Sequence, residues 1–320
     1  MKTKIISFVL CLALLSSLFI PAYATSIDVT EKVNVSVVEK DLETNKVEEK
    51  VYSNSTNGTP NVKVIDSWID KAETNFDVSE DMLANKKFGF DTPYSIIGDS
   101  DGRTKVSSTK VHPYSAIVYL DIFFGAINVR GTGFLISDNV VATAGHCIYD
   151  DEYGWATSIS VMPGKTGYGV FHDPYGVATA KKMAVSHQWL NSNDSNYDWG
   201  AIEIRSGLIG NPGKINIASL SDNNSAIKIS GYPGEFAGKT TYAQYEMSGA
   251  VSFSTSYRYY YTIDTSGGQS GAPILDANNV AVGIHTSGDK TNTYNSGIKF
   301  TDSVLYYLNL CISNGVGYYE

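Results

Sequence analysis

The chain has few cysteines, few prolines and no excess of positive charge. Its 320 residues include 3 Cys and 9 Pro, and the formal net charge at pH 7 is −9. A net negative charge argues against nucleic acid as the partner, because it repels the phosphate groups. Cys11 lies inside an N-terminal apolar run, so a chain that has lost this run keeps only Cys147 and Cys311. A bond between them is possible by count alone, and we predict two free, buried thiols.

Long apolar runs are also lacking beyond the N-terminus. Lys2 and Lys4 precede the apolar run 5–20, which is followed by Ala22-Tyr23-Ala24. A membrane span needs about 20 apolar residues, and an Ala-x-Ala site is typical of signal-peptide cleavage. We therefore predict a signal peptide at 1–24, a secreted, extracellular product and no membrane association after its removal. A retained membrane anchor is the less favoured alternative.

Glycine is nearly absent from residues 25–94, where Gly58 and Gly89 are the only two of the 29 in the chain. This segment is rich in Glu, Lys, Asp, Asn and Val, and 54–61 reads like a linker. Its strand-like runs are too few for a large core. We predict a propeptide at 25–94, with a small independent binding domain as the alternative.

From residue 95 onward, short strands alternate with turns. Strand-like runs occur at 116–122, 134–136, 140–143, 158–162, 227–230, 259–263, 272–275 and 280–285. Many short strands at regular spacing predict a sandwich or a barrel. One helix is predicted at 303–312, where apolar residues recur at helical spacing after Thr301 or Asp302 as N-cap and before Gly315.

A glycine-rich serine motif stands at Thr265–Pro273, Thr-Ser-Gly-Gly-Gln-Ser-Gly-Ala-Pro. A serine hydroxyl attacks a carbonyl only with the help of a base and of donors for the developing oxyanion. The glycines allow a tight turn in which the amides of Gly268 and Ser270 point to one spot, an oxyanion hole. By itself such a motif is more often a surface turn, but two other stretches favour a catalytic role.

These stretches carry His146, after the small-residue run 142–145, and Asp198, at the head of the alternating strand 199–204. A carboxylate beside a histidine raises its affinity for a proton, which makes it a stronger base. His146 would take the proton of Ser270 and return it to the leaving amine. The remaining histidines outside 280–285 lie in turns or polar loops, and Asp194, the rival of Asp198, lies in a solvated loop.

In this order and spacing, the three motifs resemble those of the chymotrypsin-fold serine proteases. The resemblance covers the chain from about residue 95 to its end. It is more specific to the glutamyl endopeptidases of the staphylococcal V8 and Bacillus type. The stretches that carry it are the start Ser95–Gly98, the histidine loop Ala142–Asp150, the turn Ser230–Glu235 and the pocket strand Gly283–Thr286.

The resemblance implies an all-β fold of two six-stranded antiparallel β-barrels with a C-terminal helix, the first barrel at 95–205 and the second, with the helix, at 206–320. It implies a serine endopeptidase without cofactor or metal that cuts protein and peptide substrates after glutamate, and less readily after aspartate, through an acyl-enzyme. We expect a monomer that acts on substrates with acidic residues.

The resemblance also assigns the substrate-binding residues. Thr265 and His285 occupy the family's pocket positions, and a hydroxyl and an imidazole both donate hydrogen bonds to a carboxylate. Cleavage between Tyr94 and Ser95 would free an amine at Ser95 that joins them. The direction of the Asp264 side chain stays open, and an aspartate facing the pocket would repel acidic substrates.

Two positions depart from related patterns. The Bacillus enzymes have a cysteine shortly before the equivalent of Gly131, paired with the one after the histidine, whereas this chain has Val129-Arg130 there, so that disulfide is absent. Gln269 stands where animal zymogens of this fold use a carboxylate to capture the new amino terminus, and an amide cannot form that ion pair.

Three alternatives were weighed against this interpretation. An α/β-hydrolase is disfavoured because Ala272 replaces the last glycine of its motif, the histidine precedes the serine and no βαβ rhythm is visible. A chymotrypsin-fold protease with another specificity stays open, as does a non-catalytic binding homologue, although the latter usually loses one of the three catalytic residues.

Overall fold

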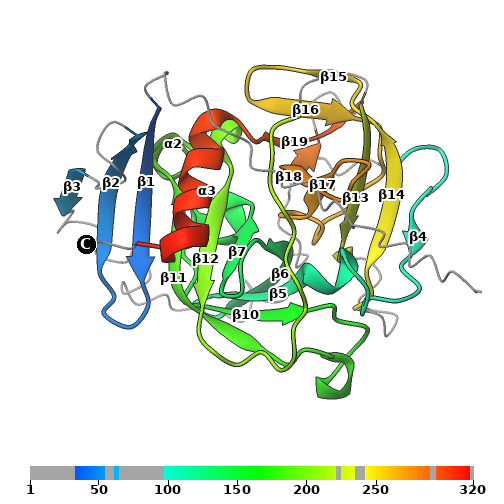
Figure 1. Ribbon diagram of the computed structural model, residues 1–320, viewed down its shortest axis with the longest axis horizontal. Helices are drawn as coiled ribbons and strands as arrows, with labels where there is room; N and C mark the ends of the chain where they lie inside the picture. Colours follow the sequence, from blue (N-terminus) through cyan, green and yellow to red (C-terminus); the bar gives the residue numbers. More distant parts are fainter. Residues whose placement is uncertain are drawn as a thin grey trace, which may run out of the picture.

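The computed structural model describes residues 33–54, 61–64, 97–220, 225–234, 242–288 and 293–317. The predicted signal peptide, Tyr94 and Ser95 lie outside these residues. Within them the fold is built mainly of strands, in a nine-stranded and an eight-stranded sheet that lie side by side (Figure 1). The all-β, chymotrypsin-type fold predicted from the sequence is confirmed.

Six strands of the first sheet close into a barrel. They are β5 (Ile117–Phe124), β6 (Ile127–Leu135), β7 (Val140–Thr143), β10 (Ser158–Pro163), β11 (Ala178–Ser186) and β12 (Gly200–Ile204). They pair in the order β10-β5-β6-β7-β12-β11, and β11 pairs back onto β10. Every residue of β7 and β12 is buried, because these strands face the barrel core on one side and are covered on the other, where α3 lies (Figure 1).

The second sheet is open rather than closed. Its order is β15-β16-β19-β18-β17-β13-β14-β4, and no pairing among the described residues joins β15 to β4. It therefore forms a half-barrel. Its strands are β4 (Thr104–Lys105), β13 (Ala226–Gly231), β14 (Tyr245–Ala250), β15 (Phe253–Ser254), β16 (Arg258–Tyr261), β17 (Pro273–Leu275), β18 (Ala281–Gly288) and β19 (Asn295–Lys299).

The predicted propeptide contributes strands to the first sheet. These are β1 (Asn34–Asp41), β2 (Val47–Ser53) and β3 (Asn61–Val64). β1 pairs antiparallel with β11, from Val37 opposite Ser186 to Asp41 opposite Lys182. Figure 1 shows these strands at the left end of the molecule, beside α3.

Among the described residues, two α-helices and one small hairpin accompany the two sheets. They are α2 (His187–Ser192), α3 (Asp302–Asn314) and the hairpin of β8 (Tyr149–Asp150) and β9 (Gly154–Trp155). α3 confirms the helix predicted at 303–312. It begins after Thr301 and ends before Gly315, whose φ of 82° suits glycine.

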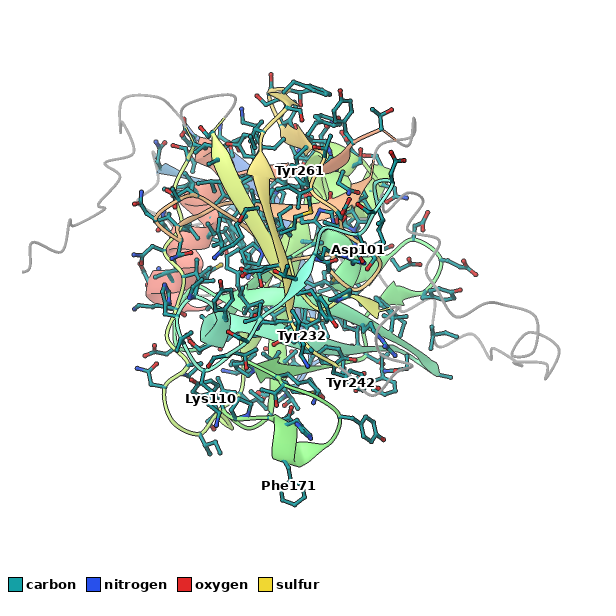
Figure 2. The ribbon with its side chains drawn as sticks, turned by 90° about the vertical axis from the view of Figure 1, so that its right-hand side faces the viewer. Asp101, Lys110, Phe171, Tyr232, Tyr242 and Tyr261 are labelled. Atoms are coloured by element: carbon teal, nitrogen blue, oxygen red, sulfur yellow. The ribbon has the colours of Figure 1, made fainter. Side chains whose placement is uncertain are left out.

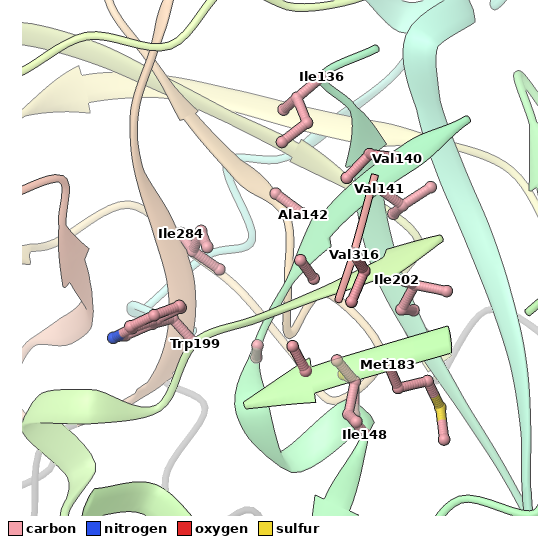
Figure 3. Packing of buried hydrophobic residues seen from close by; sticks show 14 of the residues in the cluster. Ile136, Val140, Val141, Ala142, Ile148, Met183, Trp199, Ile202, Ile284 and Val316 are labelled. Carbon is pink, nitrogen blue, oxygen red and sulfur yellow. The ribbon is translucent and has the colours of Figure 1, made fainter. Parts of the chain in front are cut away.

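The larger hydrophobic core fills the first barrel and continues beyond it. Figure 3 shows Val141 of β7 and Ile202 of β12 in this core together with Ile284 of β18 and Val316, which follows α3. A smaller core lies under the second sheet and includes Ile229, Tyr261 and Ile274. Because Ile284 belongs to the larger core, the two sheets are packed against each other and hold the segments between them in fixed positions.

Candidate active site

Adjacent strands bring His146 and Asp198 together. His146 lies in a single 3₁₀ turn, Gly145–Cys147, directly after β7, and Asp198 lies two residues before β12, which pairs with β7. The ring Nδ1 of His146 is 2.8 Å from Asp198 Oδ2, and the backbone N–H of His146 donates to Asp198 Oδ1 at 2.9 Å. A Cβ at Gly145 would come within 3.1 Å of Asp198 Oδ1, which explains the glycine before the histidine.

The two side chains shift each other's pKa in opposite directions. Burial by itself would lower the pKa of His146, but the Asp198 carboxylate outweighs it and raises that pKa well above 6.5. Burial would raise the pKa of Asp198, but the charge and hydrogen bonds of His146 hold it below 3.8. An ionised Asp198 keeps a proton on Nδ1, so the neutral ring has Nε2 free to accept a second proton.

Ser270 is held between the two sheets. Its hydroxyl donates to the carbonyl of Thr286 on β18 at 3.1 Å, and its own carbonyl accepts from the amide of Thr132 on β6 at 2.8 Å. Cys147, the neighbour of His146, has its Sγ 3.7 Å from the carbonyl oxygen of Ser270. The structure therefore brings His146, Asp198 and Ser270 to one place, with the serine hydroxyl turned to Thr286.

The peptide plane before Gly268 is fixed by a hydrogen bond. The carbonyl of Gly267 accepts from the amide of Gly234 at 2.6 Å. In a trans peptide the N–H points away from the carbonyl, so the amide of Gly268 points away from Gly234. The φ of Gly268 is 94°, and a Cβ there would come within 2.5 Å of the Tyr232 carbonyl. Only glycine fits this position.

The amide of Ser270 is oriented by the same means. The preceding carbonyl, that of Gln269, accepts from the amide of Ala272 at 2.9 Å. The described residues form many backbone hydrogen bonds outside the helices and strands, and in none of these is the amide of Gly268 or of Ser270 the donor. Two oriented N–H groups beside a serine hydroxyl can stabilise an oxyanion.

Thr132 was not predicted to have a role, yet it connects three parts of the site. Its buried hydroxyl donates to the Gly268 carbonyl at 2.7 Å and accepts from the amide of Tyr232 at 3.0 Å. A Cβ at Gly131 would come within 2.8 Å of Cys147 Sγ, and one at Gly133 within 2.6 Å of a Val141 methyl group. The Gly-Thr-Gly motif was the available signal, because close packing on both sides leaves room for a side chain only at the threonine.

The predicted pocket residues are both buried and differ in their partners. The Thr265 hydroxyl is fully buried and has no hydrogen-bond partner among the described residues. The ring Nδ1 of His285, on β18, is 2.8 Å from the Tyr261 hydroxyl. Burial, followed by the nearby His146 and Arg258, lowers the pKa of His285 to about 3. The imidazole is therefore neutral at ordinary pH and offers one donor and one acceptor.

Arg258 is a second residue for which no role was predicted from the sequence. Its buried guanidinium donates to Thr286 Oγ1 at 2.7 Å, to Ser296 Oγ at 2.6 Å and to the Ser195 carbonyl. It forms no ion pair with a described carboxylate, and its charge contributes to lowering the pKa of Asp198. Arg258 therefore places a buried positive charge near enough to Asp198 to affect its pKa. It lies in an ordinary strand, β16, and no sequence motif indicates its role.

Asp264 is engaged by the chain's own backbone. Its Oδ1 accepts from the amide of Gly98 at 2.8 Å and its Oδ2 from the amide of Gly102 at 2.7 Å. The orientation left open by the sequence is thus set by a segment more than 160 residues away. Ser95 is outside the described residues, but Gly98, three residues later, is bound beside the serine motif.

Both remaining cysteines are free and buried, as predicted. Burial raises the pKa of the Cys311 thiol well above its ordinary value, which keeps it protonated and unreactive. In the part of the chain that the structure describes, no helix is long and apolar enough to cross a membrane.

The chain resembles known proteins over most of its length. A family model described as trypsin matches residues 105–310. A glutamyl endopeptidase of Bacillus licheniformis is 34% identical over 235 residues, which are 69% of this chain and 71% of that protein. A glutamyl endopeptidase of Staphylococcus epidermidis is 25% identical over 291 residues, 87% of this chain and 90% of that protein. A solved structure, a Glu endopeptidase in complex with MPD, has a TM-score of 0.61 at 36% identity, covering 68% of this chain and all of that one.

One relative carries a different kind of name. A protein of Bacillus subtilis called extracellular metalloprotease is 35% identical over 221 residues, 66% of this chain and 68% of that protein. Across the described ranges, no group of three or more His, Cys, Asp and Glu side chains is arranged to hold a metal ion. The described residues instead bring together a serine, a histidine and an aspartate, Ser270, His146 and Asp198.

Proposed function

Because this chain belongs to the trypsin family of serine proteases and is a serine endopeptidase related to the glutamyl endopeptidases, we propose that it is secreted and cuts protein and peptide substrates after glutamate, less readily after aspartate. The observation that carries the specificity is the buried Thr265 hydroxyl without a partner, in a site that also holds a neutral His285. A buried hydroxyl left unpaired is costly, and a bound carboxylate would supply the missing acceptor.

The proposed reaction uses the three residues gathered at the site. The Ser270 hydroxyl leaves the Thr286 carbonyl, gives its proton to His146 Nε2 and attacks the substrate carbonyl carbon. The amides of Gly268 and Ser270 bind the oxyanion of the tetrahedral intermediate. His146 then protonates the leaving amine, and water hydrolyses the acyl-enzyme by the same steps in reverse. Asp198 stabilises the charged imidazole throughout.

His285 can act as a donor to the substrate carboxylate. Burial raises the pKa of the Tyr261 phenol well above its ordinary value, so the phenol keeps its proton. A protonated Tyr261 can donate to Nδ1 of His285, and we propose this arrangement, in which the ring proton lies on Nε2. Nε2–H and the Thr265 hydroxyl then both serve the carboxylate, and the free amine of Ser95 adds a positive charge.

The proposed organisation is a signal peptide at 1–24, a propeptide at 25–94 and a protease of two β-domains, 95–205 and 206–320, that acts as a monomer. No glutamate precedes the proposed cut between Tyr94 and Ser95, so another protease performs it. The two halves are interlocked, because β4 pairs with β14 in the second sheet and α3 packs on the core of the first.

Digestion of a random peptide library by the mature protein tests this proposal. We expect new carboxyl termini to end in Glu, with fewer ending in Asp. Cleavage mainly after Lys, Arg or large apolar residues would show a serine protease of other specificity. Absence of any cleavage, together with absence of labelling by a fluorophosphonate, would favour a binding homologue.

A further inference from the structure

A buried arginine from the start of the protease region contacts the serine motif. Arg103 Nη1 donates to Ser266 Oγ at 2.6 Å and to Gln269 Oε1 at 2.8 Å. Its Nε and Nη2 donate to the two oxygens of Asp101 at 2.9 and 2.8 Å. The side chain of Arg103 is 1% exposed, so its charge is balanced by Asp101 and not by solvent. Asp101 lies on the side of the molecule that Figure 2 turns to the viewer.

Gln269 is the residue between the two candidate oxyanion donors, Gly268 and Ser270. Besides the bond from Arg103, its Oε1 accepts a hydrogen bond from the Ser266 backbone amide at 3.0 Å. The backbone amide of Gln269 donates to the Ser266 carbonyl, also at 3.0 Å. The turn from Ser266 to Gln269 is therefore closed by a backbone and a side-chain hydrogen bond, both supported by one guanidinium. Movement of Gln269 would turn the peptide planes on either side of it, and with them both donor N–H groups.

The contact is reciprocal. While Arg103 reaches to Ser266 and Gln269, the carboxylate of Asp264 reaches back and accepts from the amides of Gly98 and Gly102. The segment Gly98–Arg103, called here the N-terminal loop, is thus bound on both sides of the turn. None of these contacts uses a free amino terminus.

We propose that Arg103 is a positioning residue that holds Gln269, and through it the amides of Gly268 and Ser270, in the oxyanion-binding arrangement before the chain is cut. Cleavage before Ser95 then completes the carboxylate pocket and does not assemble the oxyanion site. Gln269 cannot form the ion pair with a new amino terminus that animal zymogens of this fold use, and the hydrogen bond from Arg103 to Gln269 serves instead. This inference rests on the proposed function.

The first test measures the mature enzyme with Arg103→Met and with Gln269→Met. Loss of one oxyanion donor costs about 10²–10³ in turnover, and a loosened donor costs less, so we expect kcat to fall about 10-fold to 100-fold. KM should change less than kcat, because the hydrogen bonds of Arg103 go to Ser266 and Gln269 of the turn. The inhibition constant of a glutamyl peptide aldehyde, whose adduct places an oxyanion in the site, should weaken in parallel with kcat/KM.

Two further variants separate positioning from general stability. Gln269→Glu keeps the acceptor for Arg103 and should retain most of the activity. Arg205→Met removes a partly exposed arginine of the first sheet, which bonds to the Ala180 carbonyl, and should leave kcat and aldehyde binding unchanged. If Arg103→Met does not fold, Gln269→Met decides, because it keeps the Arg103–Asp101 pair.

The second test uses the full chain with Ser95→Pro, which blocks the proposed cut. A small neutral fluorophosphonate should label Ser270 at a rate similar to that of the mature enzyme, and adding Arg103→Met should slow labelling. A precursor that does not react while the mature enzyme does would overturn the inference. So would a lower melting temperature of Arg103→Met and Gln269→Met with unchanged kcat and unchanged aldehyde binding. If the mature wild type neither labels nor cleaves peptides, the proposed function itself fails.

Discussion

At the scale of the residue, the Thr132 hydroxyl connects two segments of the site, a role that its place in the sequence does not indicate. This hydroxyl joins the Gly268 carbonyl to the Tyr232 amide, so it holds the serine motif against the turn that follows β13. Thr132→Val keeps the shape but leaves both partners unpaired. We predict a fall in kcat of about tenfold to a hundredfold, as expected for weakened oxyanion binding, measured by steady-state kinetics on a glutamyl peptide.

The matched control for this prediction is Thr109→Val. Thr109 is also a buried threonine, and its hydroxyl donates to the Gly164 carbonyl, away from the serine motif. It should lose stability without a specific loss of kcat. Equal effects of the two substitutions on kcat would contradict the role given to Thr132.

The pH profile tests the pair of His146 and Asp198. Only a neutral His146 accepts the Ser270 proton, so kcat/KM falls as pH drops through its pKa. Because Asp198 raises that pKa well above 6.5, the acid limb should lie above the range of an ordinary histidine. Asp198→Asn removes the charge, so it should move the limb to lower pH and reduce the plateau by about 10⁴-fold, as in related triads. An unmoved limb would show that another group controls the profile.

Ser270→Ala is the simplest test of the nucleophile. We expect unchanged folding by circular dichroism and a loss of turnover of about 10⁶-fold, since a triad member acts as part of a unit. The wild type should react with a fluorophosphonate at this residue. Near-normal activity of the variant would rule out the assignment.

At the scale of the element, the hairpin of β1 and β2 is tied to α3 by a buried cluster. Glu39 pairs with Lys50 and accepts from the hydroxyls of Tyr52 at 2.8 Å and Tyr307 at 2.9 Å. Lys50→Met leaves Glu39 without its cation, and breaking a buried pair costs about 3–5 kcal/mol. We therefore predict a large loss in the free energy of unfolding of the full chain, measured with urea.

The double variant Glu39→Leu with Lys50→Met provides the control. Replacing both charges by apolar groups is often close to neutral, but the hydroxyls of Tyr52 and Tyr307 lose their acceptor, so part of the lost stability should return. If the double variant is as unstable as Lys50→Met alone, the ion pair does not explain the effect.

The elements differ in how far the sequence predicts them. β5 and β7 could be predicted from short apolar runs next to turns, and α3 from apolar residues that recur at helical spacing between capping residues. The pairing of β1 with β11 could not, since it joins segments that lie far apart in the sequence and depends on long-range packing that no local pattern encodes. For the same reason, three features could not be predicted: the contacts of Arg103 and Thr132 with the serine motif, and the orientation of Asp264. Each of them joins residues more than 100 positions apart in the sequence.

At the scale of the whole molecule, the described strands of the predicted propeptide and the strand β4 lie at opposite ends. Figure 1 shows β1–β3 at the left end of the molecule and β4 at the right. The described strands of the propeptide pack on β11 and α3, and the serine motif contacts the N-terminal loop instead. The N-terminal loop, which contacts the serine motif, and the strand β11, on which the hairpin docks, therefore lie in separate parts of the molecule.

The central claim is that Thr265 and His285 select a glutamate side chain, and two peptides that differ only in Glu or Gln before the cut bond test it most directly. Mature wild type should cleave the Glu peptide with a much higher kcat/KM. Thr265→Val should lower kcat/KM for the Glu peptide about 10-fold to 100-fold, the worth of one hydrogen bond to a charged group, and change the Gln peptide little. Equal kcat/KM for the two peptides in the wild type, or an equal loss for both in Thr265→Val, would contradict the account.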